Sequence, residues 1–441
     1  MGMKEPAVTP FAPTSAHKLR WEQIRSKKLR FSKKTRFSKR LRLRGVAAAA
    51  ALAVVAAGGV AAVPAAASSD TSLGQDELQS EVARTLREAG YIGMSVEVRD
   101  GRRRVLARAG EAELHTGRPV PYGANFRAAS VTKAFVATVV LQLAAEGRLS
   151  LDDTVDSWLP GLVSGHGNDG RRITIRNLLQ HTSGIYNYGL EEDLGDTAED
   201  FERTKLYHID PEQSIAGAMR HSPDFPPADP DDPAPKWNYS NPNYMLAGLI
   251  IKKATGRPWA DEVRDRVIRP LGLKDTYEPG DDPYLKQPYA HNYHRFPGSD
   301  RWTDTTVRNI SWADAAGSLV TSQRDLDRFF TALLGGRLLP AAQLAEMRRA
   351  VPVGPDFEMA FPGLRYGLGL MRQPLSCGGY RWGHGGDLEG GTVRTAFSAD
   401  GRRSVVISAS GTTSDDERLL RAERAVQALL DRVMCGEVVK P

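Results

Sequence analysis

A serine and a lysine stand three residues apart in Ser130-Val131-Thr132-Lys133. Residues at this spacing share one face of a helix, so the Lys133 amine would lie beside the Ser130 hydroxyl. A serine hydroxyl is a weak nucleophile, and a nearby lysine can take its proton when burial lowers the pKa of the amine. The motif therefore predicts nucleophilic catalysis. The same spacing also occurs near the N-terminus, in Ser15-Ala16-His17-Lys18.

Tyr239-Ser240-Asn241 is a second candidate, placed between a loop rich in Pro and Asp and an apolar helical pattern. A tyrosine can pass a proton to a leaving group, and an amide side chain can bind both a substrate carbonyl and a lysine. Taken alone, the tripeptide also fits a turn that caps the following helix.

His384-Gly385-Gly386 is a third candidate, at the end of an expected strand. Glycines on an edge strand let a substrate backbone approach and pair as a further strand. His115-Thr116-Gly117 has a similar form but precedes the serine and follows no long strand.

The elements that must position these motifs follow from periodicity. Apolar residues at helical spacing predict a helix from Leu78 to Ala89, a buried helix from Ser130 to Gly147, and several helices in the middle of the chain. Alternating residues predict a hairpin turning at Asp100-Gly101 and, near the C-terminus, strands over 366–370, 380–383, 392–397 and 404–409. Ser414 and Glu417 predict a capping box before a last helix.

This order predicts an α+β fold, with an antiparallel sheet built from both chain ends, flanked by helices, and an all-helical region inserted between them. Residues 75–436 would form this one domain.

The formal net charge of +6 is very unevenly distributed along the chain. Residues 1–44 hold far more Lys and Arg than acidic residues, and the rest of the chain is net acidic, which argues against a nucleic-acid-binding body. An uncharged Ala- and Val-rich run over 45–67 ends in an Ala-x-Ala site. Residues 1–67 thus predict an export signal or, uncleaved, an N-terminal anchor on the outer face of the cytoplasmic membrane.

Export would place the only two cysteines, Cys377 and Cys435, in an oxidising compartment, where a disulfide is expected. No zinc-type cysteine spacing occurs, and His291 and His294 lack an interpretable third ligand. We expect no metal, no cofactor and a monomer.

The three motifs occur in the order Ser-x-x-Lys, Tyr-x-Asn and His-x-Gly. In this order they resemble the motifs of the penicillin-recognising serine hydrolase superfamily. Within that superfamily, the chain is most similar to the branch of secreted D-alanyl-D-alanine carboxypeptidases and class C β-lactamase-like proteins. The resemblance runs from about Leu78 to Cys435 and includes the stretches 173–185, 312–320 and 366–370. Exocellular carboxypeptidases of this group have a disulfide where the two cysteines fall.

The resemblance implies a role for each matching residue. Ser130 would be acylated, Lys133 would be the general base, and Tyr239 would carry the proton. The backbone N–H groups of Ser130 and Asp387 would form the oxyanion hole. The implied substrate-binding residues are Asn241, Trp312 as an aromatic wall, His384 in place of the third motif's basic residue, Gly385 and Gly386.

One departure concerns the substrate. The carboxypeptidases bind the terminal carboxylate of their peptide with threonines in the third motif and an arginine on the preceding strand. Here Gly385 and Asp387 replace the threonines, and Met371 stands at the arginine position with Arg372 beside it. Asp387 would repel a carboxylate unless it points away and Arg372 or Arg394 compensates.

We therefore expect an exported serine hydrolase acting on small peptides or β-lactams, first of all a D-alanyl-D-alanine carboxypeptidase. The alternatives are an esterase, an amidase also open to an amino-terminal D-residue, a β-lactamase-type enzyme, or a penicillin-binding sensor with slow turnover.

Overall fold

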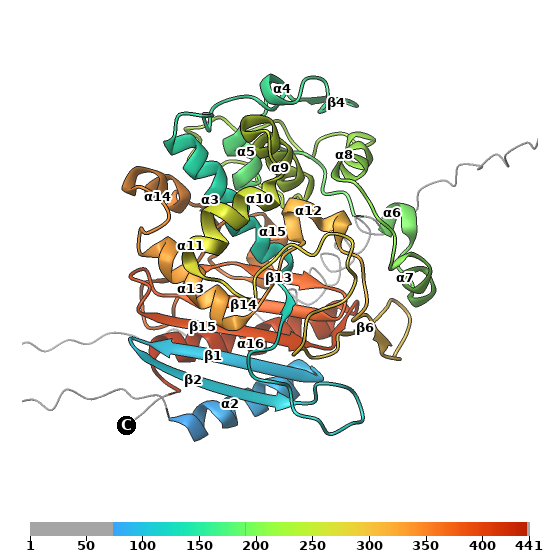
Figure 1. Ribbon diagram of the computed structural model, residues 1–441, viewed down its shortest axis with the longest axis vertical. Helices are drawn as coiled ribbons and strands as arrows, with labels where there is room; N and C mark the ends of the chain where they lie inside the picture. The colour runs from blue at the N-terminus through green and yellow to red at the C-terminus, as the bar shows by residue number, and fades with distance from the viewer. Residues whose placement is uncertain (1–73, 190, 439–441) are drawn as a thin grey trace, which may run out of the picture. The chain divides into compact units, whose positions relative to one another are not determined.

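A twisted antiparallel sheet dominates the fold (Figure 1), and the computed structural model describes residues 74–189 and 191–438. The strand order is β2-β1-β15-β14-β12-β11-β10-β9, with β13 also paired to β14. These strands are β1 (Gly93–Asp100), β2 (Arg103–Gly110), β9 (Val351–Pro352), β10 (Arg365–Tyr366), β11 (Met371–Pro374), β12 (Tyr380–Gly383), β13 (Gly385–Leu388), β14 (Gly391–Phe397) and β15 (Arg403–Ser410).

The first strand pairs with the last long one, since Gly93 lies opposite Ser410 and Asp100 opposite Arg403. Two terminal helices, α2 (Gln75–Ala89) and α16 (Asp416–Cys435), pack on each other and on the sheet. The predicted α+β fold, with a sheet from both chain ends, is confirmed.

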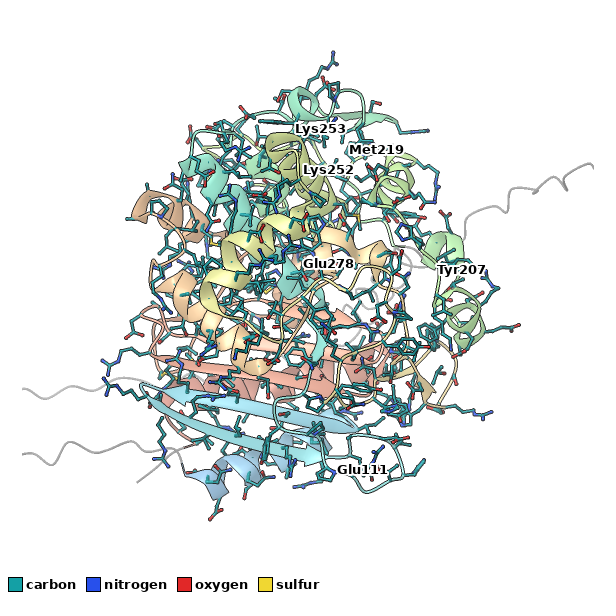
Figure 2. All side chains as sticks on the ribbon, in the orientation of Figure 1. Glu111, Tyr207, Met219, Lys252, Lys253 and Glu278 are labelled. Atoms are coloured by element: carbon teal, nitrogen blue, oxygen red, sulfur yellow. A yellow bond between two sulfur atoms is a disulfide. The ribbon has the colours of Figure 1, made fainter. Side chains whose placement is uncertain are left out.

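A helical block fills the chain between β2 and β9 and covers the other face of the sheet (Figure 1). Its helices are α3 (Thr132–Ala145), α4 (Val155–Trp158), α5 (Ile175–Gln180), α6 (Glu191–Leu194), α7 (Ala198–Thr204), α8 (Pro211–Met219), α9 (Pro242–Thr255), α10 (Trp259–Val263), η2 (Arg264–Ile268), α11 (Arg269–Leu271), α12 (Asp314–Gly317), α13 (Gln323–Leu334) and α14 (Ala341–Arg348). Lys252 and Lys253, labelled in Figure 2, lie in the last turn of α9, where cations interact favourably with the helix dipole.

Short elements complete the chain. The turns η1 (Ala129–Val131) and η3 (Ser311–Ala313) precede α3 and α12, and α15 (Pro355–Ala360) lies between β9 and β10. The remaining strands are β3 (Phe126–Arg127), β4 (Ser164–Gly165), β5 (Asn168–Asp169), β6 (Tyr293–Arg295), β7 (Thr303–Asp304), β8 (Val320–Thr321) and β16 (Thr412–Thr413).

Two apolar cores lie on opposite faces of the sheet, because successive strand residues point in opposite directions. Val405 belongs to the core under α2 and α16, whereas Val406 belongs to the core of the helical block. In that second core, Phe135 of α3 stacks on Phe329 of α13 with ring centroids 3.6 Å apart. Core packing therefore holds in place the helix that follows the nucleophile.

Two local predictions were wrong. Residues 366–370 are not one strand, because Gly369 (φ 69°) turns the chain between β10 and β11. The last helix is capped by Asp415, whose side chain accepts a hydrogen bond from Arg418 N, and not by the predicted pair Ser414 and Glu417.

The predicted leader over 1–67 lies outside the described residues. Within 74–189 and 191–438, no helix has both the length and the apolar character needed to cross a bilayer.

Candidate active site

Ser130 begins the nucleophilic helix at a strained turn. Ala129, just before it, has φ 47°, a left-handed conformation that costs a residue with a Cβ about 1–2 kcal/mol. The next residues continue as η1 and α3, and Ser130 itself is partly exposed. Strain at a functional turn persists where the surrounding packing enforces it.

Lys133 is fully buried, and its amine lies among three oxygen atoms. Nζ is 3.0 Å from Ser130 Oγ, 2.8 Å from Asn241 Oδ1 and 2.7 Å from the Ala316 carbonyl oxygen. Burial lowers the pKa of Lys133 well below its ordinary value. As a neutral amine, it donates to the amide and carbonyl oxygens and accepts from the Ser130 hydroxyl, as a general base must.

Tyr239 and Asn241 come from the loop before α9 and meet the first motif. Tyr239 lies beside Ser130, and Lys133 Nζ is 4.8 Å from the centre of the tyrosine ring. Burial raises the pKa of Tyr239, so its phenol keeps its proton and can donate it.

His181 supports this loop from behind. Its Nδ1 accepts a hydrogen bond of 3.2 Å from Ser240 N, and its ring centroid is 4.2 Å from that of Tyr239. His181 has φ 61° and ends α5. His181 therefore has a structural role at the end of α5, behind Tyr239.

His384 is buried and uses both ring nitrogens within the protein. Nδ1 is 2.6 Å from the Gly385 carbonyl oxygen, which can only accept, so Nδ1 carries the proton. Nε2 then accepts from the Tyr366 hydroxyl at 2.9 Å. Burial, with a smaller contribution from Lys133, lowers the pKa of His384 to about 3. The third motif therefore carries no positive charge here.

Gly386 brings β13 against the nucleophile. A methyl group at this position would lie 2.3 Å from the Ala128 carbonyl oxygen and 3.0 Å from Ser130 N. Only glycine permits this approach. It places the β13 backbone at Gly386 against the turn that carries Ser130. The oxyanion hole of Ser130 and Asp387 stays a prediction.

Asp387 points to the opposite face of β13 from Gly386, because neighbouring strand residues alternate. Its Oδ1 accepts from Thr392 Oγ1 at 2.7 Å and is 3.0 Å from Arg394 NH1, while 62% of its side chain is exposed. Arg394 also binds Glu423 at 2.6 Å. A methyl group on Gly385 would be only 3.3 Å from Arg394 NH1, so the glycine leaves room for this arginine.

Two expected substrate-binding residues are not placed at the nucleophile by any contact in the described part of the chain. The Arg372 guanidinium lies 4.3 Å from the Tyr380 ring centre, and Met371, which points the other way, packs against the cluster with Tyr239. Of the two arginines offered as partners for the charge, Arg394 is the one that contacts Asp387. Trp312 lies in η3 with the Arg308 guanidinium 4.9 Å from its ring centre, and its place in the cleft wall stays a prediction.

Cys377 and Cys435 form the expected disulfide, which joins the turn between β11 and β12 to the end of α16. Among the described residues, no group of three His, Cys, Asp or Glu side chains could hold a metal ion.

Sequence reasoning missed the contributions of Ala316, Tyr366 and Phe357. Ala316 acts through its backbone oxygen, which no side-chain pattern reveals. Tyr366 lay in a stretch already singled out, and its position immediately before the Gly-Leu-Gly turn was the available signal. Phe357 stacks on Tyr239 with ring centroids 5.3 Å apart, and nothing in its local sequence marks it.

A buried amine beside a serine hydroxyl, a phenol in reach of that hydroxyl and a glycine strand along the nucleophile define a serine hydrolase of the penicillin-binding and β-lactamase type. The family described as Beta-lactamase matches residues 78–430, and this chain belongs to that family.

Relatives from the same group share most of its length. Penicillin-binding protein 4* of Bacillus subtilis (strain 168) is 31% identical over 337 residues, which cover 74% of this chain and 69% of the relative. A D-stereospecific amidohydrolase from Streptomyces sp. is 39% identical, with a TM-score of 0.70, over 79% of this chain and 98% of that structure. The D-amino acid amidase of Ochrobactrum anthropi SV3 is 25% identical, with a TM-score of 0.64, over 80% and 98% of the two chains.

Proposed function

We propose that this protein hydrolyses amides or esters of D-amino acids whose leaving group carries no carboxylate, through an acyl-enzyme on Ser130. The observation that supports this most directly is the charge beside the third motif. Asp387, Arg394 and Glu423 together carry one more negative than positive charge, and Asp387 is the exposed member. His384 adds no cation. A carboxylate placed there would be repelled.

The chemistry needs only the groups described. Lys133 takes the Ser130 proton while Oγ forms a bond to the substrate carbonyl carbon. The backbone N–H groups of Ser130 and Asp387 stabilise the oxyanion. When the bond to the leaving group breaks, Tyr239 protonates the departing atom and regains a proton from Lys133. Water then releases the D-amino acid by the same steps in reverse.

Two structural relatives, a D-stereospecific amidohydrolase and a D-amino acid amidase, support the substrate class. A D-alanyl-D-alanine carboxypeptidase is the second candidate, favoured by the likeness to penicillin-binding protein 4*. Export is part of both proposals, and the Cys377–Cys435 disulfide supports it.

The test uses two dipeptide substrates that differ in one group, D-alanyl-D-alanine and D-alanyl-D-alaninamide. We expect kcat/KM to be at least about tenfold higher for the amide, because like charges in one site cost a kcal/mol or more. Asp387→Asn should reduce this ratio, and Ser130→Ala should abolish both reactions.

Asp300→Asn is the matched control, since it removes the same charge from an aspartate whose side chain is 88% exposed and forms an ion pair with Arg418. Faster hydrolysis of the free acid by the parent enzyme would establish the carboxypeptidase instead.

A further inference from the structure

Helix α15 places an aromatic side chain directly on the proton donor. The Phe357 ring stacks on Tyr239 with centroids 5.3 Å apart and planes at 17°. It also meets Trp237 edge-on, with ring centroids 5.0 Å apart. Phe357 is partly exposed, so an apolar surface borders the Tyr239 phenol.

Phe361, one turn further on, carries this surface to the third motif. Its ring centroid is 6.0 Å from that of Phe357 and 6.0 Å from the Arg394 guanidinium carbon. Arg394 in turn lies against Gly385 and Asp387. Phe361 is also partly exposed. The two phenylalanines therefore span from Tyr239 to the outer side of β13.

This surface lies on the leaving-group side of the reacting bond. A general acid must come within hydrogen-bond distance of the atom it protonates, so the departing group lies against Tyr239 and whatever stacks beside it. A charged departing acid is disfavoured there by Asp387, whereas an uncharged aromatic group would cover the exposed parts of Phe357 and Phe361. Arg394, occupied by two carboxylates, is not free to bind an anion.

We propose that Phe357 and Phe361 form a subsite for an uncharged aromatic leaving group, such as an aryl-alkyl amine or alcohol. The proposal rests on the proposed function and names its leaving group. In the step concerned, the Ser130 Oγ–carbon bond forms, the carbon–nitrogen bond breaks, and the amine departs with the Tyr239 proton.

The test compares D-alanine 2-phenylethylamide with D-alanine ethylamide. Both give the same acyl-enzyme, so a difference in kcat/KM reports acylation alone. We expect the phenyl compound to be favoured at least about tenfold, a size typical of a well-filled apolar pocket. Phe357→Ala and Phe361→Ala should bring the ratio close to one, and Phe361→Leu should give an intermediate ratio.

Tyr122→Ala is the matched control and should keep the parent ratio. Tyr122 is 41% exposed, with the Arg108 guanidinium 4.2 Å from its ring centre, but it lies beside the β2 edge of the sheet. Tyr122 thus has an arginine over its ring, as Phe361 has Arg394, but it lies far from β13.

A binding measurement separates the two proposals. In the Ser130→Ala background, calorimetry should show the phenylethylamide binding about tenfold tighter than the ethylamide, and Phe361→Ala should remove the difference. Hydrolysis of both amides at equal kcat/KM would overturn the subsite and leave the proposed function intact. Selective binding without Ser130-dependent hydrolysis in the parent would overturn the proposed function and keep the subsite. Equal or absent binding of the two compounds overturns the subsite.

Discussion

Lys133 lies in surroundings that suit an uncharged amine. Two of its three oxygen neighbours, on Asn241 and Ala316, can only accept hydrogen bonds, and the third is the Ser130 hydroxyl. The unfolded chain holds a proton on this lysine up to its ordinary pKa of 10.5, whereas the folded protein releases it at lower pH. Lys133 therefore costs stability at neutral pH, and this cost shrinks as the pH rises toward 10.5.

The lowered pKa of Lys133 also predicts the pH dependence of acylation. We expect kcat/KM to fall as the pH drops through the lowered pKa of Lys133, because the protonated amine cannot accept the Ser130 proton. Lys133→Arg should be inactive at every pH, since its guanidinium stays charged. Pre-steady-state acylation rates across the pH range provide the measurement, and a rate that rises toward acid pH would contradict the assignment.

For single residues, the spacing of motifs in the sequence was enough to predict which side chains meet. It was not enough to predict the direction in which each side chain points. Ser130 and Lys133 share a helix face, so their contact follows from periodicity. The direction of Asp387 depends on the register of β13 against β14, and that pairing is set by residues elsewhere in the sheet. For the same reason, adjacent Met371 and Arg372 could not be assigned to a face in advance.

Among the elements, strand β13 approaches the nucleophilic turn most closely. Gly386→Ala should reduce kcat/KM at least about a hundredfold, because its methyl group would collide with the backbone at Ala128 and Ser130 and displace an oxyanion donor. Gly385→Ala should have a smaller effect, since its nearest neighbour is the Arg394 side chain at 3.3 Å. Kinetics on folded variants, checked by circular dichroism, measure the difference. Equal losses at the two positions would contradict this account of β13.

Elements with a long and clear apolar pattern were predictable, such as α2, α3 and the hairpin of β1 and β2. The segment 366–370 was not, because its alternation is interrupted by a turn that packs against α3, where a methyl group on Gly369 would be 2.9 Å from the Lys133 carbonyl oxygen. That turn depends on a tertiary contact, which local pattern does not encode.

For the whole molecule, the disulfide ties the turn between β11 and β12 to the last helix. Cys377 and Cys435 are 58 residues apart, so the bond restricts a long loop of the unfolded chain. Cys377→Ser should lower the free energy of unfolding by about 2–4 kcal/mol. Urea denaturation of the variant, of Cys435→Ser and of the reduced parent should give the same loss, and an unchanged midpoint would show that the bond contributes nothing to stability.

The pairing of β1 with β15 has a consequence for how this enzyme is made. The central strands of the sheet come from segments hundreds of residues apart, so the fold has a high contact order and should form slowly. Strand β13 and the nucleophilic turn meet only when the C-terminal strands have joined the sheet. During synthesis the helical block emerges before β9 to β15, which form most of the sheet. Catalytic competence is therefore among the last properties the chain acquires.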